Sequence, residues 1–301
     1  MDNHVSFSII IPTYQRPQEL QNCLAAIARM DYPREFFEVI VVNDGGSQPL
    51  APIIDKFFNQ MNVRLLSQPS AGPAAARNNG ASQAIHQHLV FTDDDCMPAA
   101  DWLRRFENRI MPGQAGAVAG RIINALDKNR YSASSQILID FLNHYYNADP
   151  HKARFFTSNN LMLPADIFWE IGGFDTSFSR AAAEDRDLCD RLLFRGKKIV
   201  FAAEITVLHA HALNFRTFFR QHFNYGRGAY DYHKNHTMRH RMHVRMESVS
   251  FYSSLVRHPL SDQSAKFRFT ASLLLIVSQI ANAAGYFMRS GERPLNKSLF
   301  S

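Results

Sequence analysis

Three consecutive aspartates, Asp93, Asp94 and Asp95, have the side chains whose chemistry is easiest to name. They follow His88 to Thr92, an apolar run that is typical of a short buried strand. Adjacent carboxylates repel one another, and Mg²⁺ or Mn²⁺ would relieve that repulsion through oxygen ligands. In an extended loop Asp93 and Asp95 would point to one side and Asp94 to the other. The alternative is a solvated acidic turn that caps a helix beginning near Pro98.

Two other segments have residue types suited to a nucleotide. In Asn43-Asp44-Gly45-Gly46, Asp44 can accept hydrogen bonds from a base or ribose, and the glycines allow close backbone approach. Gly72 to Asn78 begins a helix with small residues and offers the guanidinium of Arg77, which suits oxyanions and flat bases. A plain tight turn is the alternative for the first segment, and an alanine-rich packing helix for the second.

Two pairs of residues farther along the chain could complete a catalytic centre. Glu184 and Asp185 begin a helical pattern, where the helix dipole favours carboxylates, so they are either simple end caps or a general base. His209 and His211 would face one side of an extended segment, and imidazole is a ligand for transition metals. A purely structural histidine pair is the alternative.

Strand and helix patterns alternate through the first hundred residues, and these elements must position the polar loops. The strand-like runs are 5–11, 37–42, 62–67 and 88–92, and the helical ones are 17–30, 50–60 and 73–87. This alternation predicts an α/β fold with a parallel sheet covered on both faces. Ligands of such sheets bind where the carboxyl ends of the strands open into loops, and both acidic loops follow strands.

Beyond residue 100 the pattern predicts strands at 115–123 and 197–202 and helices at 131–147 and 184–194. From residue 213 the chain is helical and basic. We therefore expect an α/β catalytic domain over 1–212 and a helical, basic C-terminal extension over 213–301. Within that extension, 269–288 has no charged side chain, which leaves open membrane-surface attachment, internal packing or a membrane span.

Composition indicates the chemical class of the binding partners and the cellular compartment, but not a particular ligand. The 301 residues carry a formal net charge of +6, which favours anionic partners such as nucleotide phosphates, nucleic acid or an acidic membrane surface. The cysteines Cys23, Cys96 and Cys189 form no metal or disulfide pattern, so we expect reduced thiols. The opening MDNHVSFSII has no basic stretch of a signal peptide, so we expect a cytoplasmic protein, with attachment to the inner face of the membrane left open.

Seven stretches, in this order, resemble the family 2 glycosyltransferases. They are SIIIPTYQRP (8–17), VIVVNDGG (39–46), AGPAAARNNG (71–80), LVFTDDDC (89–96), IGGFDTSF (171–178), AEDRDLCDRL (183–192) and VLHAHALNFRTFFRQHFNYGRG (207–228). The resemblance implies the GT-A fold, a Rossmann-like nucleotide-sugar-binding domain with a mixed, mostly parallel sheet. It implies inverting, hexosyltransferase-type transfer from a nucleoside-diphosphate sugar to a hydroxyl acceptor: a glycan, a lipid-linked sugar or a small molecule. Mn²⁺ or Mg²⁺ would be the cofactor, and the reaction would belong to polysaccharide biosynthesis. Nucleic acid is not expected as a partner.

The same resemblance assigns roles to residues. The positions implied to bind the donor are Pro12, Thr13, Tyr14, Asp44, Arg77, Asp93 and Asp94. Asp95 would bind the metal with His209, or with His211 in its place. Asp185 would be the catalytic base. Spacing from Leu188 and Leu192 places Asp185 at the edge of the inward face of its helix but does not exclude Glu184, and the family pattern favours Asp185.

Two rival functions use the same features. A nucleotidyltransferase would also need acidic metal ligands, but it would be expected to have a glycine-rich phosphate loop near the N-terminus, and residues 8–17 contain no glycine. A non-enzymatic protein that binds anionic surfaces would use the Arg-, Lys- and His-rich segment 227–245.

Overall fold

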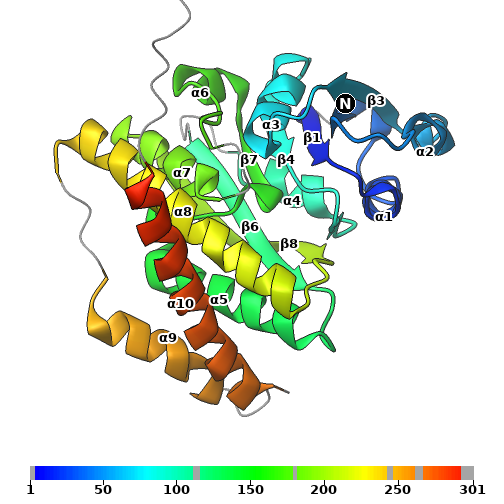
Figure 1. Cartoon of the computed structure of the whole chain (residues 1–301). Helices are drawn as coiled ribbons and strands as arrows, with labels where there is room; N and C mark the ends of the chain where they lie inside the picture. The colour runs from blue at the N-terminus through cyan, green and yellow to red at the C-terminus, as the bar shows by residue number, and fades with distance from the viewer. Residues whose placement is uncertain (1–3, 111–115, 179–181, 243–246, 262–266, 293–301) are drawn as a thin grey trace, which may run out of the picture.

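In the computed structural model, residues 4–110, 116–178, 182–242, 247–261 and 267–292 are described. An eight-stranded sheet with the order β3-β2-β1-β4-β7-β6-β8-β5 forms the centre of the molecule (Figure 1). The strands are β1 Phe7–Thr13, β2 Phe37–Asp44, β3 Asn62–Gln68, β4 His88–Phe91, β5 Cys96–Pro98, β6 Gly116–Asn124, β7 Leu161–Pro164 and β8 Lys198–His209. The helices are α1 Pro17–Ile27, α2 Ala51–Ile54, α3 Pro73–Ser82, α4 Trp102–Glu107, α5 Arg130–Tyr146, α6 Ala165–Glu170, α7 Glu184–Phe194, α8 Phe215–His240, α9 Val249–Ser261 and α10 Arg268–Gly291.

The N-terminal half of the sheet is parallel, as the strand–helix alternation predicts. Strand β1 pairs in parallel with β2 and β4, and β2 pairs in parallel with β3. All seven residues of β1 are buried, because helices cover both faces of the sheet. The register places Thr13 beside Asn43 and Asn43 beside Ser67, so the polar loops after β1, β2 and β3 open at one edge.

The C-terminal half of the sheet is mixed. Strand β7 is antiparallel to both β4 and β6, β8 is parallel to β6, and β5 is antiparallel to β8. The α/β fold with a mixed sheet and a helical C-terminal region is confirmed, whereas the helix expected near Pro98 is not. Pro98 ends β5 and the next helix begins at Trp102, because three residues of β5 pair with the far end of β8.

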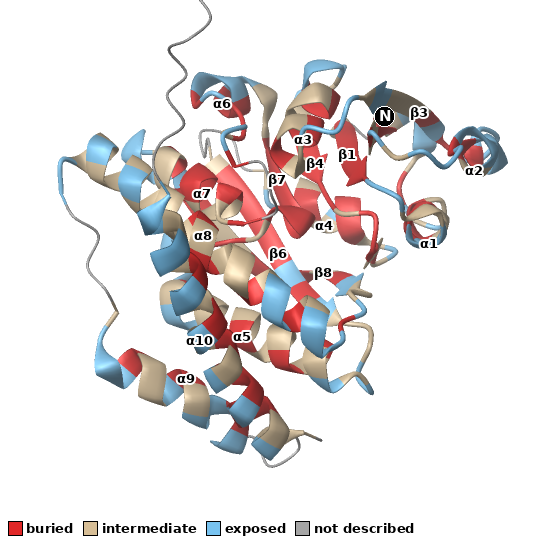
Figure 2. Cartoon of the chain, viewed as in Figure 1, coloured by how far each residue is buried: buried red, intermediate tan, exposed pale blue. Residues whose placement is uncertain are grey.

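Helices α8, α9 and α10 pack with α5 on one side of the sheet (Figure 1). Glycines let α8 and α10 approach closely: a Cβ on Gly226 would lie 1.8 Å from the carbonyl oxygen of Asn282, and one on Gly285 would lie 1.9 Å from that of Phe223. Figure 2 shows buried and exposed residues alternating along α10, so only one face of this helix packs inward.

Candidate active site

Asp95 lies at the centre of a potential metal site. Its Oδ1 is 3.2 Å from Nε2 of His209, and its Oδ2 is 3.1 Å from Nδ1 of His211. Both histidines therefore contact the carboxylate of Asp95. Although burial opposes ionisation, hydrogen bonds from the two histidines hold the pKa of Asp95 well below its usual range.

The surrounding backbone explains this convergence. Strand β5 pairs Cys96 with His209, and the backbone N–H of Ala210 donates to the Asp95 carbonyl at 2.8 Å. The hydroxyl of Ser132, in the first turn of α5, donates to the His211 carbonyl at 2.6 Å. Strand β8 and helix α5 together hold the two imidazoles beside the aspartate loop.

Asp94 points back toward β1. The loop is not extended, since residues 94 and 95 form a turn, and side-chain alternation therefore does not describe it. One oxygen of Asp94 accepts a hydrogen bond from the Thr13 hydroxyl at 2.7 Å, and the other from Arg16 at 3.2 Å. Burial raises the pKa of Asp94 to about 7. In this arrangement Asp94 and Thr13, both expected at the donor, tie the ends of β1 and β4 together.

Arg77 connects the aspartate loop to helix α7. Its guanidinium donates to Asp93 Oδ1 at 2.7 Å and to Glu184 Oε1 at 3.3 Å. The side chain is buried and lies over the ring of Phe174. Arg77 thus neutralises carboxylates from two elements, which is a different contact from the base or phosphate contact that the resemblance implies.

The two acidic residues that begin α7 have different surroundings. Glu184 is bound to Arg77 and also accepts the Ala182 N–H at 2.6 Å, and burial raises its pKa to about 7. Asp185 has a shielded Oδ1 without a hydrogen-bond partner among the described residues, and burial raises its pKa too. Ala183, just before the pair, has a left-handed backbone with φ of 68°, a conformation that costs free energy in a residue with a Cβ. Of the pair, only Asp185 has an oxygen without a hydrogen-bond partner among the described residues, and the side chain and backbone of Ser158 hydrogen-bond to the same carboxylate.

The remaining predicted donor residues lie at the same edge of the sheet. Asp44 accepts hydrogen bonds from Gln68 Nε2 and from the backbone N–H groups of Ala71 and Gly72, at 2.8–2.9 Å. This carboxylate therefore shapes the loop before α3. Pro12 lies within the buried strand β1, and Tyr14 is exposed just beyond its end.

Two residues at the site were given no role by sequence reasoning. Arg16 donates to Asp95 Oδ2 at 2.9 Å as well as to Asp94. Tyr225 of α8 is partly buried near three carboxylates. Burial raises its pKa to about 12, and the charges of Asp185, Glu184 and Asp93 add to that rise. Both lie inside stretches that resemble the family, but the sequence gives no sign that they lie beside these carboxylates.

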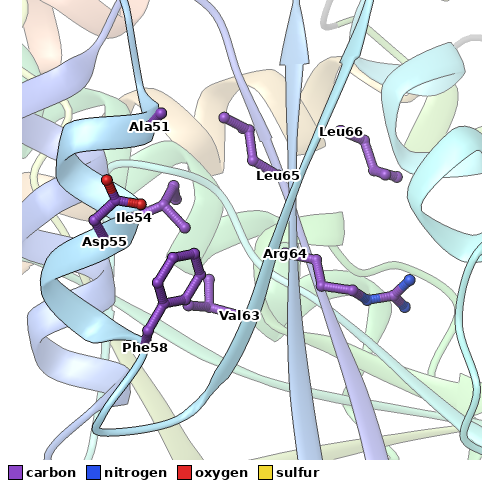
Figure 3. A pocket seen from close by; sticks show the side chains of 8 residues that line it. All are labelled: Ala51, Ile54, Asp55, Phe58, Val63, Arg64, Leu65 and Leu66. Carbon is purple, nitrogen blue, oxygen red and sulfur yellow. The ribbon is translucent and has the colours of Figure 1, made fainter.

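A separate groove of about 500 Å³ runs between α2 and β3 (Figure 3). Its walls are mostly apolar, with Ile54, Phe58 and Leu65 among them, and none of the site residues above lines it. Strand β3 is an edge strand, so this groove lies on the outer side of the sheet, away from the histidines.

The match to a protein family agrees with this geometry. Residues 8–172, which include the three aspartates and Arg77, match the model described as glycosyl transferase family 2. The chain belongs to glycosyl transferase family 2. The family resemblance drawn from the seven sequence stretches is thereby confirmed, and the chain is a glycosyltransferase.

Curated relatives of this family 2 glycosyltransferase have diverse substrates. It is 25% identical to glycosyltransferase AglE of Haloferax volcanii over 224 aligned residues, and the alignment covers 73% of this chain and 72% of AglE. It is 25% identical over 225 residues to a validoxylamine A glucosyltransferase of Streptomyces hygroscopicus subsp. jinggangensis, covering 65% of this chain. The chain spans 53% of that relative and 47% of a Mycobacterium tuberculosis pre-mycofactocin glycosyltransferase.

Solved structures share the fold of this family 2 glycosyltransferase. A mannosyltransferase of Pyrobaculum calidifontis, in complex with GDP-Man and Mn²⁺, aligns with a TM-score of 0.69 at 15% identity, over 97% of this chain and 89% of that one. TarS residues 1–349 of S. aureus, in complex with UDP-GlcNAc, align with a TM-score of 0.55 at 15% identity, over 94% and 89%. At these identities the likeness shows the fold.

Proposed function

We propose that this glycosyltransferase moves a sugar from a nucleoside-diphosphate sugar to a hydroxyl acceptor, with inversion and with a divalent cation. The observation that carries the proposal is the grouping of Asp95, His209 and His211, whose ligand atoms all lie within 4.8 Å of one another. Asp95 follows β4, and His209 and His211 lie at the carboxyl end of β8. Ligands of a sheet covered on both faces bind at such strand ends. The complexes of the similar folds with GDP-Man and with UDP-GlcNAc support a nucleotide sugar as the donor.

The ligands of the proposed metal site suit Mn²⁺ better than Mg²⁺. One carboxylate and two imidazoles are ligands that transition metals accept, whereas Mg²⁺ prefers oxygen. Asp95, His209 and His211 would hold the ion, and the diphosphate would complete its coordination. The ion would act as a Lewis acid that stabilises charge on the leaving diphosphate.

Asp185 is the base in this proposal. Ser158 hydrogen-bonds this carboxylate, but its Oδ1 has no hydrogen-bond partner among the described residues and can accept the acceptor's proton. Both oxygens of Glu184 are already bonded, one to Arg77 and one to the Ala182 N–H. Arg77, bound to Asp93 and Glu184, keeps α7 beside the aspartate loop. Inversion follows if the deprotonated hydroxyl displaces the diphosphate directly, because no enzyme nucleophile intervenes. Catalysis is assigned to 1–212, with 213–301 as the helical extension.

Calorimetry of GDP and UDP, each with and without Mn²⁺, tests the cation requirement. We expect tight nucleotide binding only with the ion, and loss of that difference in Asp95→Ala. Equal affinity with and without Mn²⁺ would contradict the proposal. A screen of nucleotide sugars for thermal stabilisation would then identify the donor, since a bound ligand stabilises the folded state by mass action.

We further propose that the chain attaches to the cytoplasmic face of a membrane through α10. Within the described residues this is the one helix long and apolar enough to cross a membrane by length and composition. Its outward residues Phe269, Leu273, Ile280 and Phe287 are each 60–71% exposed. Its opposite face packs against α8, which favours a helix lying on a membrane surface over a span.

A further inference from the structure

A second group of metal-ligand side chains joins α7 to α8, away from the site described above. Nε2 of His240 lies 2.9 Å from Oδ1 of Asp190, and Nε2 of His236 lies 3.6 Å from the same oxygen. The two imidazoles are four residues apart on α8, so they share one face of the helix, and their ring centroids are 4.1 Å apart. Three potential ligand atoms thus face one point from two helices.

These separations match those that a tetrahedral zinc site requires. Zinc binds imidazole nitrogen and carboxylate oxygen at about 2.0–2.2 Å, which places neighbouring ligand atoms about 3.4 Å apart. The two nitrogen–oxygen distances bracket that value, and all three ligand atoms lie within 4.8 Å of one another. A small adjustment of the side chains would therefore be enough to bind the ion, with water in the fourth position.

Neighbouring side chains hold the three potential ligands in place. Arg239 donates to the other oxygen of Asp190 and, at 2.8 Å, to Asp187, which fixes the carboxylate while leaving Oδ1 for a ligand. Hydrogen-bonded outer partners of this kind orient metal ligands. The ring of Phe194 lies against His240 and that of Tyr232 against His236.

The group is distinct from the catalytic centre. Asp190 follows Asp185 by five residues on α7, so their side chains point about 140° apart around the helix axis. The group of Asp190, His236 and His240 has no residue in common with the Asp95 group. Imidazoles with one carboxylate favour zinc over Mg²⁺ or Ca²⁺, which require more oxygen ligands.

We propose that Asp190, His236 and His240 form a zinc site that fastens α8 to α7, the helix that contains Asp185. The bound ion would replace one hydrogen bond, between His240 and Asp190, and one longer contact, between His236 and Asp190, with three coordinate bonds between the helices. Its role is structural: it stabilises the contact between the catalytic α/β region and the helical extension. The proposal does not depend on the sugar-transfer reaction.

The test measures zinc binding to the full chain in a His209→Ala/His211→Ala background, which removes the first histidine pair. Competition against a chromophoric chelator gives the affinity and stoichiometry, and Co²⁺ absorbance reports tetrahedral coordination. We expect one zinc per chain. His236→Ala and His240→Ala should each weaken binding by more than about tenfold, since even loss of an outer-shell partner costs that much.

His233→Ala is the matched control, because this histidine lies on the same helix and bonds Tyr286 instead. It should leave zinc affinity unchanged. Far-UV circular dichroism checks folding, and His240→Gln replaces His240→Ala if the alanine variant is unfolded. Absence of stoichiometric zinc in the background chain, or unchanged affinity in both His236→Ala and His240→Ala, overturns the proposal. Because no activity is measured, neither outcome bears on the proposed transfer reaction.

Discussion

Asp185 and Glu184 are neighbours in sequence, yet their carboxylates have different partners. Glu184 is held by Arg77 and the Ala182 N–H, whereas Oδ1 of Asp185 has no hydrogen-bond partner in the described chain. Two adjacent helical side chains point about 100° apart, so only one of them can face a bound donor. At the scale of single residues, these contacts favour Asp185 as the base.

Asp185→Asn should therefore reduce sugar transfer by about 10²–10⁴-fold, the usual contribution of a general base. Nucleotide and Mn²⁺ binding should persist, because asparagine keeps the shape of the side chain. Steady-state transfer and calorimetry measure the two properties. Asp166→Asn, in the first turn of α6, is the matched control and should leave transfer unchanged. Near-normal turnover in Asp185→Asn would move the assignment to Glu184.

Asp94 makes a second prediction at this scale, which concerns pH. Burial raises its pKa from 3.8 to about 7 in the folded chain. Between these values the folded state binds more protons than the unfolded state, so stability falls as pH rises, by up to about 1.4 kcal/mol per pH unit. Asp94→Asn removes this titrating group, so the free energy of unfolding of the variant should decrease less as pH rises. Relative to the unchanged ligand-free chain, the variant should therefore be stabilised more at pH 8 than at pH 5.

Urea unfolding at the two pH values measures that difference. Asp31→Asn is the control, because this carboxylate is mostly exposed on the surface. A stability gain in Asp94→Asn that is equal at both pH values would show that Asp94 does not titrate with a raised pKa.

At the scale of elements, the contact between α8 and α10 depends on glycines. Gly285→Ala would place a Cβ 1.9 Å from the Phe223 carbonyl oxygen, so the helices would have to separate. Such overpacking typically costs about 1–3 kcal/mol. We expect a lower melting temperature for Gly285→Ala. Gly291→Ala, at the end of the same helix with no atom within 4 Å, should be close to neutral. Similar melting temperatures for the two variants would contradict this packing.

At the scale of the whole molecule, α10 is the element proposed to meet the membrane. Its exposed residues Phe269, Leu273, Ile276, Ile280 and Phe287 are separated by three, four or seven positions, so they form one stripe along the helix. Replacing Leu273 and Ile280 with serine should reduce binding to anionic lipid vesicles severalfold, as judged by co-sedimentation. The control is a double variant of Ile85 and Phe58, which are exposed on the α/β region.

A chain truncated after residue 260 gives a second measurement. It should shift from the membrane fraction to the soluble fraction, provided that circular dichroism shows it to be folded. If the serine variant still binds vesicles as the unchanged chain does, α10 is not the membrane contact.

The sequence by itself determined the elements whose patterns are local. Hydrophobic periodicity predicted α7 at 184–194 with the bounds that the structure has, and it placed the strands β1 to β4 in the first hundred residues. It also predicted polar loops at the carboxyl ends of those strands, because parallel strands end at one edge. The family followed from the order of the short stretches rather than from any one of them.

Only the tertiary structure decided which distant side chains meet. Strands β5 and β7, of three and four residues, were not predicted from the sequence, and pairing with β8, β4 and β6 makes them strands. The contacts of Arg16 and both histidines with Asp95 join residues 79 to 116 positions apart. A one-dimensional pattern records which side chains are available, but long-range pairing of the sheet fixes which of them share a site.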